Sequence, residues 1–168
     1  MSRELQDVKR IVLKVGTNLL SSKDGIDELC IDSIVEQIAL LMQKNYQVLL
    51  VTSGAIGMGA KELHLKGPVK QVAMRQACAS IGQPLLMSSY RRAFKKHGLV
   101  CSQILLTRKD LNNRHTYVNL RNSVFTLLDL GVIPIFNEND VVSTAEIGSA
   151  FGDNDRMSAM VASKIDAD

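Results

Sequence analysis

The chain has 168 residues and a formal net charge of +3, with 46% hydrophobic, 22% charged and 4% aromatic residues. This composition excludes an intrinsically disordered protein, and the length fits one domain with a sizeable core. The small charge and the few aromatic residues argue against a nucleic-acid-binding surface, and the basic segment 91–97 is better explained as the end of a long helix.

The sequence also argues against membrane insertion, secretion and a cysteine zinc site. The N-terminus is charged and lacks an apolar signal core, and no uncharged apolar run reaches transmembrane length. Cys30, Cys78 and Cys101 are odd in number and far apart, which favours neither a disulfide framework nor a zinc site. We therefore expect a cytoplasmic protein that binds no membrane and has no metal site of its own.

Short apolar runs alternate with stretches of helical periodicity along the chain. Strands are predicted at 11–13, 48–51, 99–106 and 132–136. Helices are predicted at 31–42, in a long stretch that ends near 97, at 117–128 and from 152 onward. Strands that alternate with helices favour an α/β fold, with a mainly parallel sheet between helices. The pattern calls for another strand after Asp168, so we expect a partial domain.

Three details of this pattern carry structural predictions. Gly131 is expected to cap the C-terminus of the helix that precedes it. Pro134 lies within a predicted strand, and because proline donates no ladder hydrogen bond, we expect an edge position or a bulge there. Residues 141–147 have the pattern of a short hairpin arm.

Three of the apolar runs stop abruptly at polar residues. The first run is followed by Lys14 and Gly16, the second by Ser53 and Gly54, and the fourth by the acidic and amide segment 137–140. Ligands gather outside the carboxyl ends of parallel strands. We therefore predict one site that collects an ammonium group, a hydroxyl group beside glycine backbone, and carboxylates.

Phosphate binding would need an unusual motif here, because the sequence has neither a Walker A segment nor protein-kinase motifs. Lys14 with Gly16 and Gly54 offers an ammonium group and accessible backbone N–H groups instead. The spacing of Gly54, Gly57 and Gly59 differs from the dinucleotide fingerprint, so an oxidoreductase is a distant second interpretation. These small residues are alternatively explained as allowing a helix to pack close to the sheet.

Segments 137–140 and 152–155 together hold four carboxylates and three amides. The EF-hand's glycine and distal glutamate are missing, which argues against calcium. Asp153 or Asn154 is alternatively explained as a helix N-cap.

Five ordered motifs resemble the glutamate 5-kinases of the amino acid kinase family. They are 14–17, 51–56, 75–83, 134–140 and 152–155, and the resemblance runs from about Lys9 to the end. It implies the amino acid kinase, or carbamate kinase-like, fold. Residues 1–168 would then be the N-terminal amino-acid-binding lobe, with most of the nucleotide-binding half missing. The resemblance further implies a homo-oligomer, and proline as a feedback inhibitor.

The implied reaction is the ATP-dependent phosphorylation of the γ-carboxylate of L-glutamate to L-glutamyl 5-phosphate, the first step of proline biosynthesis, with Mg²⁺ on the ATP phosphates. This nucleophile needs no general base, because a glutamate carboxyl with a reference pKa of about 4.3 is ionised at neutral pH. Catalysis then consists of alignment and charge stabilisation.

The resemblance also implies residue roles. Lys14 would contact the transferring phosphoryl group, with Gly16 beside it at the nucleotide phosphates, and Asp155 would orient Lys14. Asp140 suits the α-ammonium group of the substrate. The family's glutamate-binding positions are matched by Ser53, Gly54, Asp140 and Asn154.

Two alternatives stay open at this point. One keeps the fold and phosphoryl transfer but changes the acceptor to acetylglutamate, aspartate or UMP. The other is a non-catalytic fragment that binds glutamate or proline without turning over ATP.

Overall fold

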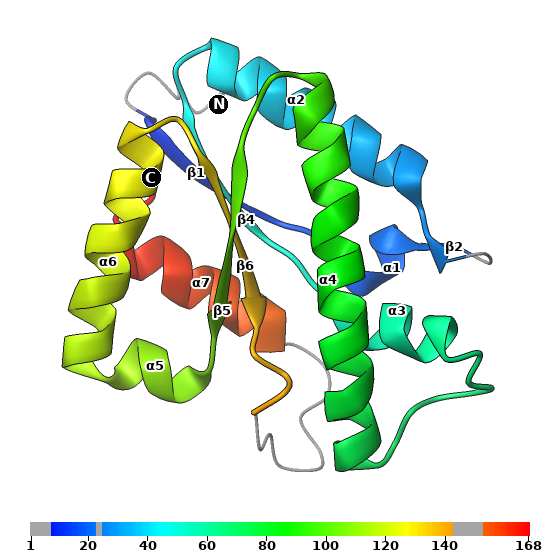
Figure 1. Ribbon diagram of the computed structural model, residues 1–168. Coiled ribbons are helices and arrows are strands. Elements are labelled where there is room, and N and C mark those ends of the chain that lie inside the picture. Colours follow the sequence, from blue (N-terminus) through cyan, green and yellow to red (C-terminus); the bar gives the residue numbers. More distant parts are fainter. Residues whose placement is uncertain (1–7, 23–24, 143–152) are drawn as a thin grey trace, which may run out of the picture.

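A sheet of four parallel strands forms the centre of the molecule (Figure 1). The computed structural model describes residues 8–22, 25–142 and 153–168. The strand order is β1-β4-β6-β5, and a separate antiparallel pair joins β2 to β3. The strands are β1 (Arg10–Lys14), β2 (Ser21–Ser22), β3 (Gly25–Ile26), β4 (Gln47–Val51), β5 (Cys101–Leu106) and β6 (Ile133–Glu138).

Helices cover both faces of the sheet, which confirms the predicted α/β architecture (Figure 1). Helices α2 and α4 pack on one face, and α6 and α7 pack on the other. The helices are α1 (Thr17–Leu20), α2 (Glu28–Gln43), α3 (Ala55–Glu62), α4 (Val72–Lys96), α5 (Arg108–Asn112), α6 (Arg114–Asp129) and α7 (Asp153–Lys164).

Strand β4 shows why the apolar runs of this chain are continuous rather than alternating. Val48 and Leu50 belong to the core that α2 and α4 cover, whereas Leu49 and Val51 belong to the core that α6 and α7 cover. Successive side chains of a strand point to opposite faces, so a strand that is covered on both faces needs apolar residues at every position.

The predicted strands and the long helices are confirmed, with shifts at their ends that local capping explains. Helix α2 begins three residues before the first apolar position of its pattern, because the side chain of Asp27 accepts a hydrogen bond from the Cys30 N–H at 2.9 Å and caps the helix. Gly131 adopts a φ of 69° after α6 and donates its N–H to the Leu128 carbonyl, as a C-terminal cap does.

Helix α5 was not predicted. It begins with a capping box, in which the Thr107 side chain bonds the Asp110 backbone and the Asp110 side chain accepts from the Thr107 N–H. That spacing of threonine and aspartate was the available sequence signal.

The prediction of an edge position or bulge at Pro134 is wrong, since β6 lies between β4 and β5. Ile133 donates its N–H toward the β5 side, to the Val100 carbonyl, so the nitrogen of the next residue faces β4. The pairing of β6 with β4 begins only at Ile135. Pro134 therefore lies before the start of that ladder, and its missing N–H removes no hydrogen bond from it.

The suggestion that the small residues of segment 54–59 bring a helix close to the sheet needs correction. Helix α3 approaches helix α4 instead. A Cβ atom on Gly59 would lie 1.8 Å from the Cys78 carbonyl oxygen, and one on Gly82 would lie 1.8 Å from the Ala55 carbonyl oxygen. The two glycines permit a backbone contact between helices that no other residue would allow.

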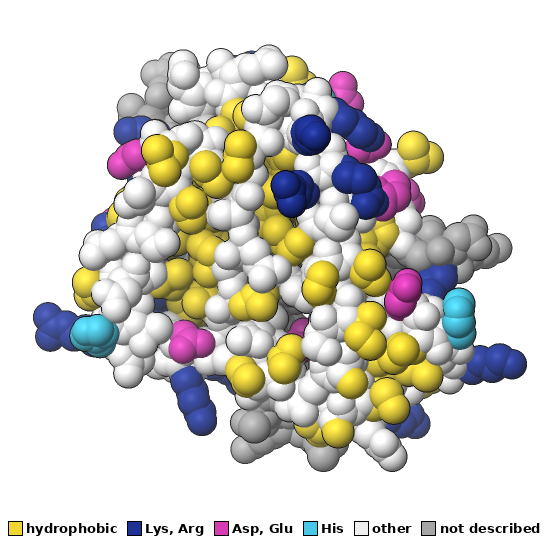
Figure 2. All heavy atoms as spheres, in the orientation of Figure 1, with side chains coloured by type: hydrophobic (Ala, Val, Ile, Leu, Met, Phe, Trp, Pro, Cys, Tyr) yellow, Lys and Arg dark blue, Asp and Glu magenta, His cyan; other side chains and the backbone are white. Residues whose placement is uncertain are grey.

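The surface of α4 divides along its length. Figure 2 shows lysine and arginine side chains gathered over the C-terminal end of this helix, where Lys95 and Lys96 occupy the last turn. Arg92 and Lys96 form ion pairs of 2.6 Å with Glu28 and Asp32 of α2. The basic segment therefore complements the helix dipole and ties α4 to α2.

The last described residues run along the outer side of β1. The Asp168 carboxylate accepts hydrogen bonds from the backbone N–H groups of Lys9 and Arg10, both at 2.8 Å. The Arg10 guanidinium donates to the Asp166 carbonyl at 3.1 Å and lies over the Phe125 ring of α6. These contacts fix the C-terminal end of α7, whose other end reaches the carboxyl end of β1.

Most of the predicted hairpin arm at 141–147 lies outside the described residues. Among the helices that the structure describes, none is both long and apolar enough to cross a membrane.

Candidate functional site

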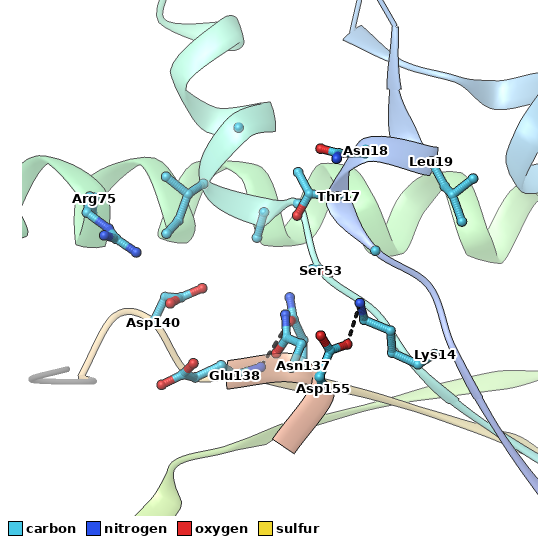
Figure 3. A pocket seen from close by; sticks show the side chains of 16 residues that line it. Lys14, Thr17, Asn18, Leu19, Ser53, Arg75, Asn137, Glu138, Asp140 and Asp155 are labelled. Carbon is cyan, nitrogen blue, oxygen red and sulfur yellow. Dashed lines mark hydrogen bonds and ion pairs between the residues drawn. The ribbon is translucent and has the colours of Figure 1, made fainter. Parts of the chain in front are cut away.

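A cavity of about 450 Å³ opens at the carboxyl ends of β1, β4 and β6 (Figure 3). Helix α1, the N-termini of α3 and α7 and the first turn of α4 complete its wall. All seven residues assigned to a site from the sequence line this cavity, namely Lys14, Gly16, Ser53, Gly54, Asp140, Asn154 and Asp155. The parallel sheet thus brings together segments that are more than a hundred residues apart in sequence.

Lys14 lies at one end of the cavity, directly after the last apolar residue of β1. Its ammonium group forms an ion pair with the Asp155 carboxylate of α7, at 2.6 Å (Figure 3). The two side chains are 35% and 67% exposed, so the pair adds little to stability, and its main effect is to orient the ammonium group. A Cβ on Gly16 would lie 3.3 Å from the Lys14 nitrogen, so glycine there leaves room for it.

Ser53 and Gly54 follow β4 and form the entry to helix α3. The buried Ser53 hydroxyl donates to the Val15 carbonyl at 3.0 Å, which leaves its oxygen free to accept a hydrogen bond. Gly54 caps α3 with a φ of 103°, a left-handed conformation that favours glycine. The first intrahelical bond runs from Met58 to Gly54, so the backbone N–H groups of residues 55–57 are available at the positive end of the helix.

Thr52, the residue before Ser53, contacts a buried tyrosine. The Tyr90 hydroxyl of α4 lies 3.0 Å from the Thr52 hydroxyl. Burial raises the pKa of Tyr90 to about 12, so this tyrosine is neutral across the physiological range. The contact links the middle of α4 to the end of β4.

Asp140 lies at the other end of the cavity, beyond the end of β6 (Figure 3). A chain of side-chain amides, of which Asn137 and Gln83 are buried, holds the strand end that precedes it. The Asn137 amide donates to the Gln83 side-chain oxygen at 2.8 Å, and the Gln83 amide donates to Gln103 at 3.0 Å. The Asn137 oxygen in turn accepts the Glu138 N–H at 2.9 Å. The protein itself therefore uses both polar atoms of Asn137.

Asn154, in the first turn of α7, contrasts with Asn137. Its side-chain oxygen is buried and has no hydrogen-bond partner among the residues that the structure describes. Leaving a buried polar atom without a partner costs free energy. A donor group of a bound molecule would relieve this cost, because Asn154 lines the cavity.

Sequence reasoning missed several residues of the cavity wall. Arg75, in the first turn of α4, lies within a family motif but received no role, and Asn137 was counted only as part of a polar cluster. The signal for Arg75 was its position, because a cation at a helix N-terminus opposes the helix dipole. Thr17, Asn18 and Leu19 of α1 also line the cavity.

The described part of the chain contains no group of three or more His, Cys, Asp or Glu side chains arranged to hold a metal ion. Three carboxylates of the described residues line the cavity, with Asp155 beside Lys14, and with Asp140 and Glu138 on the opposite side (Figure 3). This arrangement suits a ligand that carries charges at both of its ends.

Comparison with known proteins gives consistent matches. The sequence model described as "Amino acid kinase family" matches residues 9–168. Glutamate 5-kinase of Methanosarcina mazei is 46% identical over 97% of this chain, and that of Methanococcoides burtonii is 48% identical over 96% of it. Glutamate 5-kinase of Methylococcus capsulatus is 46% identical over 98%. The chain spans only 44% of the length of each of these relatives.

Proposed function

The chain belongs to the amino acid kinase family, and on this premise we propose that residues 1–168 are the amino-acid-binding lobe of a glutamate 5-kinase. The complete enzyme would transfer the γ-phosphoryl group of ATP to the γ-carboxylate of L-glutamate, giving L-glutamyl 5-phosphate for proline biosynthesis. The chain covers less than half of its relatives, so we assign most of the nucleotide-binding half to sequence that this chain does not contain.

The observation that carries the proposal is the separation of charges along the cavity. Asp140 lies at one end, and Lys14 with Asp155 lies at the other (Figure 3). Glutamate fits this polarity when its α-ammonium group meets Asp140 and its γ-carboxylate points toward Lys14. The acceptor oxygen of Ser53 and the unpartnered oxygen of Asn154 are available to further donors.

In this arrangement the protein aligns the reactants and stabilises charge. Asp155 holds Lys14, so its ammonium group can meet the transferring phosphoryl group without reorganising. An ammonium group about 4 Å from a unit charge contributes up to about 4 kcal/mol at an effective dielectric of 20, or nearly a thousandfold in rate. The backbone N–H groups at the start of α3, which precede the first intrahelical hydrogen bond, favour anions in the same cavity.

We propose ATP as the phosphoryl donor, with Mg²⁺ carried on its phosphates. Gly16 and Lys14 are the residues of this lobe that we assign to the nucleotide phosphates. The described residues contain no acidic cluster for a metal, so we assign Mg²⁺ no ligand from this chain. A cytoplasmic location, a homo-oligomeric state and inhibition by proline complete the proposal as expectations from the family.

Among acceptors, an unblocked amino acid fits the cavity better than acetylglutamate. Asp140 offers a carboxylate where acetylglutamate would place a neutral amide, and UMP carries no ammonium group at all. Titration calorimetry of this chain with L-glutamate, N-acetylglutamate, L-aspartate and UMP distinguishes these acceptors. We expect L-glutamate to bind most tightly, and a preference for acetylglutamate would overturn the assignment of Asp140.

An ATP- and glutamate-dependent hydroxamate assay tests the reaction. We expect turnover from a polypeptide in which this chain is followed by the second half of the Methanosarcina mazei relative, and none from the 168-residue chain alone. Turnover by the chain alone would show that it is more than an amino-acid-binding lobe. A longer protein that binds glutamate without turnover would favour the non-catalytic alternative.

A further inference from the structure

Two basic side chains of the described residues, Lys14 and Arg75, line the cavity. They differ in their partners. Lys14 is paired with Asp155 at 2.6 Å, whereas the Arg75 guanidinium makes no hydrogen bond or ion pair with any residue that the structure describes. Arg75 is partly buried, and its side chain points into the cavity (Figure 3).

The position of Arg75 in its helix gives no structural reason for a positive charge. Arg75 donates its backbone N–H to the Gln71 carbonyl, in the first turn of α4, where the helix dipole disfavours a cation. The other end of the same helix follows the rule, with Lys95 and Lys96 in its last turn. A residue that opposes local stability at a cavity wall is a candidate for a role in binding.

The neighbour of Arg75 indicates which group it would bind. Figure 3 shows the guanidinium on the side of the cavity that Asp140 occupies, whereas Lys14 lies on the opposite side. An amino acid that places its ammonium group against Asp140 brings its α-carboxylate to the same end. That carboxylate would be repelled by Asp140 unless a cation lay beside it, and guanidinium binds carboxylates with two parallel hydrogen bonds.

We propose that Arg75 binds the α-carboxylate of the substrate, so that Arg75 and Asp140 together recognise the zwitterionic head of a free α-amino acid. This inference rests on the proposed function. It assigns recognition of the substrate's α-carboxylate to the α4 side of the cavity. Lys14, at the far end, is left for the side-chain carboxylate and the phosphoryl group.

The test compares three ligands on the 168-residue chain by titration calorimetry at pH 7.5. L-Isoglutamine replaces the α-carboxylate of L-glutamate by an amide, and L-glutamine replaces the γ-carboxylate. We expect the native chain to bind L-glutamate at least tenfold more tightly than L-isoglutamine. In Arg75→Met, affinity for L-glutamate should fall roughly 10- to 100-fold and the preference over L-isoglutamine should disappear, while the preference over L-glutamine stays.

Two further variants separate binding from folding. Arg91→Met removes the same charge from an exposed position of the same helix, and it should leave all three affinities unchanged. Arg75→Lys keeps the positive charge but cannot form the two parallel hydrogen bonds of a guanidinium group. It should retain part of the preference for the α-carboxylate. Circular dichroism shows whether each variant is folded.

Equal affinity of the native chain for L-glutamate and L-isoglutamine would overturn the assignment of Arg75, and it would do so without any variant. The same conclusion follows if Arg75→Met weakens all three ligands by one common factor. Failure of the native chain to bind L-glutamate at all would instead overturn the proposed function, together with this inference.

Discussion

At the scale of single residues, the cavity wall contains two kinds of polar side chain. Asn137 and the Ser53 hydroxyl hydrogen are engaged within the protein, so they shape the wall. The Asn154 oxygen and the Arg75 guanidinium have no such partner among the described residues. Polar groups without a hydrogen-bond partner lower the stability of the folded protein. A bound molecule that pairs with them gains affinity from the same groups.

Asn154 should therefore lower the stability of the free protein and raise its affinity for the ligand. In Asn154→Leu, the buried oxygen is replaced by apolar atoms of similar size, which recovers about 1 kcal/mol of desolvation cost. We expect the thermal midpoint to rise by about 2–4 °C, and glutamate affinity to fall at least roughly tenfold. Differential scanning calorimetry and titration calorimetry measure the two effects. A lower midpoint would mean that the oxygen has a partner in the native protein.

Lys14 and Asp140 should affect different kinetic constants in the longer, active protein. Lys14→Ala should mainly lower kcat, by up to about a thousandfold, because the ammonium group acts on charge that develops during phosphoryl transfer. Asp140→Ala should mainly raise the KM for glutamate, because it holds a group that does not react. Steady-state kinetics with varied glutamate separates the two constants. Similar changes of both constants in both variants would contradict this division of roles.

At the scale of elements, the contact of α3 with α4 decides where the cavity lies. Helix α3 begins at Gly54 and helix α4 carries Arg75, so the distance between these helices sets the distance between the two sides of the wall. The glycines at 59 and 82 let the two backbones touch. Sequence reasoning noticed the small residues but could not identify the partner surface, because packing partners are not encoded in local spacing.

Substitutions at these glycines should have unequal effects on stability. Gly59→Ala and Gly82→Ala would place a methyl group 1.8 Å from a backbone oxygen, and we expect each to lower the free energy of unfolding by at least about 3 kcal/mol. Gly57→Ala, in the same helix as Gly59, meets no atom within 4 Å and should be neutral or stabilising by up to about 1 kcal/mol. Urea denaturation measures all three. Equal losses at the three positions would contradict the helix contact.

At the scale of the whole molecule, the sheet brings distant segments of the chain together, and the buried core fixes their relative positions. Lys14, Ser53 and Asp140 lie at or just beyond the carboxyl ends of three neighbouring strands, and α7 adds Asn154 and Asp155. Tyr90 connects the core to the site, because its hydroxyl lies against Thr52.

Tyr90 should make the stability of the protein fall in alkaline solution. The unfolded chain loses the tyrosine proton near pH 10, whereas the folded protein keeps it until about pH 12. Its contribution is therefore fully present below pH 10 and is lost as the pH rises to 12, by about 2–3 kcal/mol in all. Urea midpoints of the native protein and Tyr90→Phe between pH 8 and 11.5 should converge as the pH rises. Parallel curves would show that Tyr90 titrates alike in both states.

The parallel α/β architecture follows from the sequence, because strands covered on both faces must be apolar throughout and helices must repeat their apolar residues at helical spacing. The sequence also identified the polar residues that end these strands, since Lys14, Ser53 and Asp140 stand directly after or close behind apolar runs. Three features emerge only from the folded chain: Pro134 lies in an inner strand, α3 contacts α4, and Arg75 lies on the same side of the cavity as Asp140. These features depend on which surfaces meet in space, and a linear pattern records the face that each element buries but not its partner.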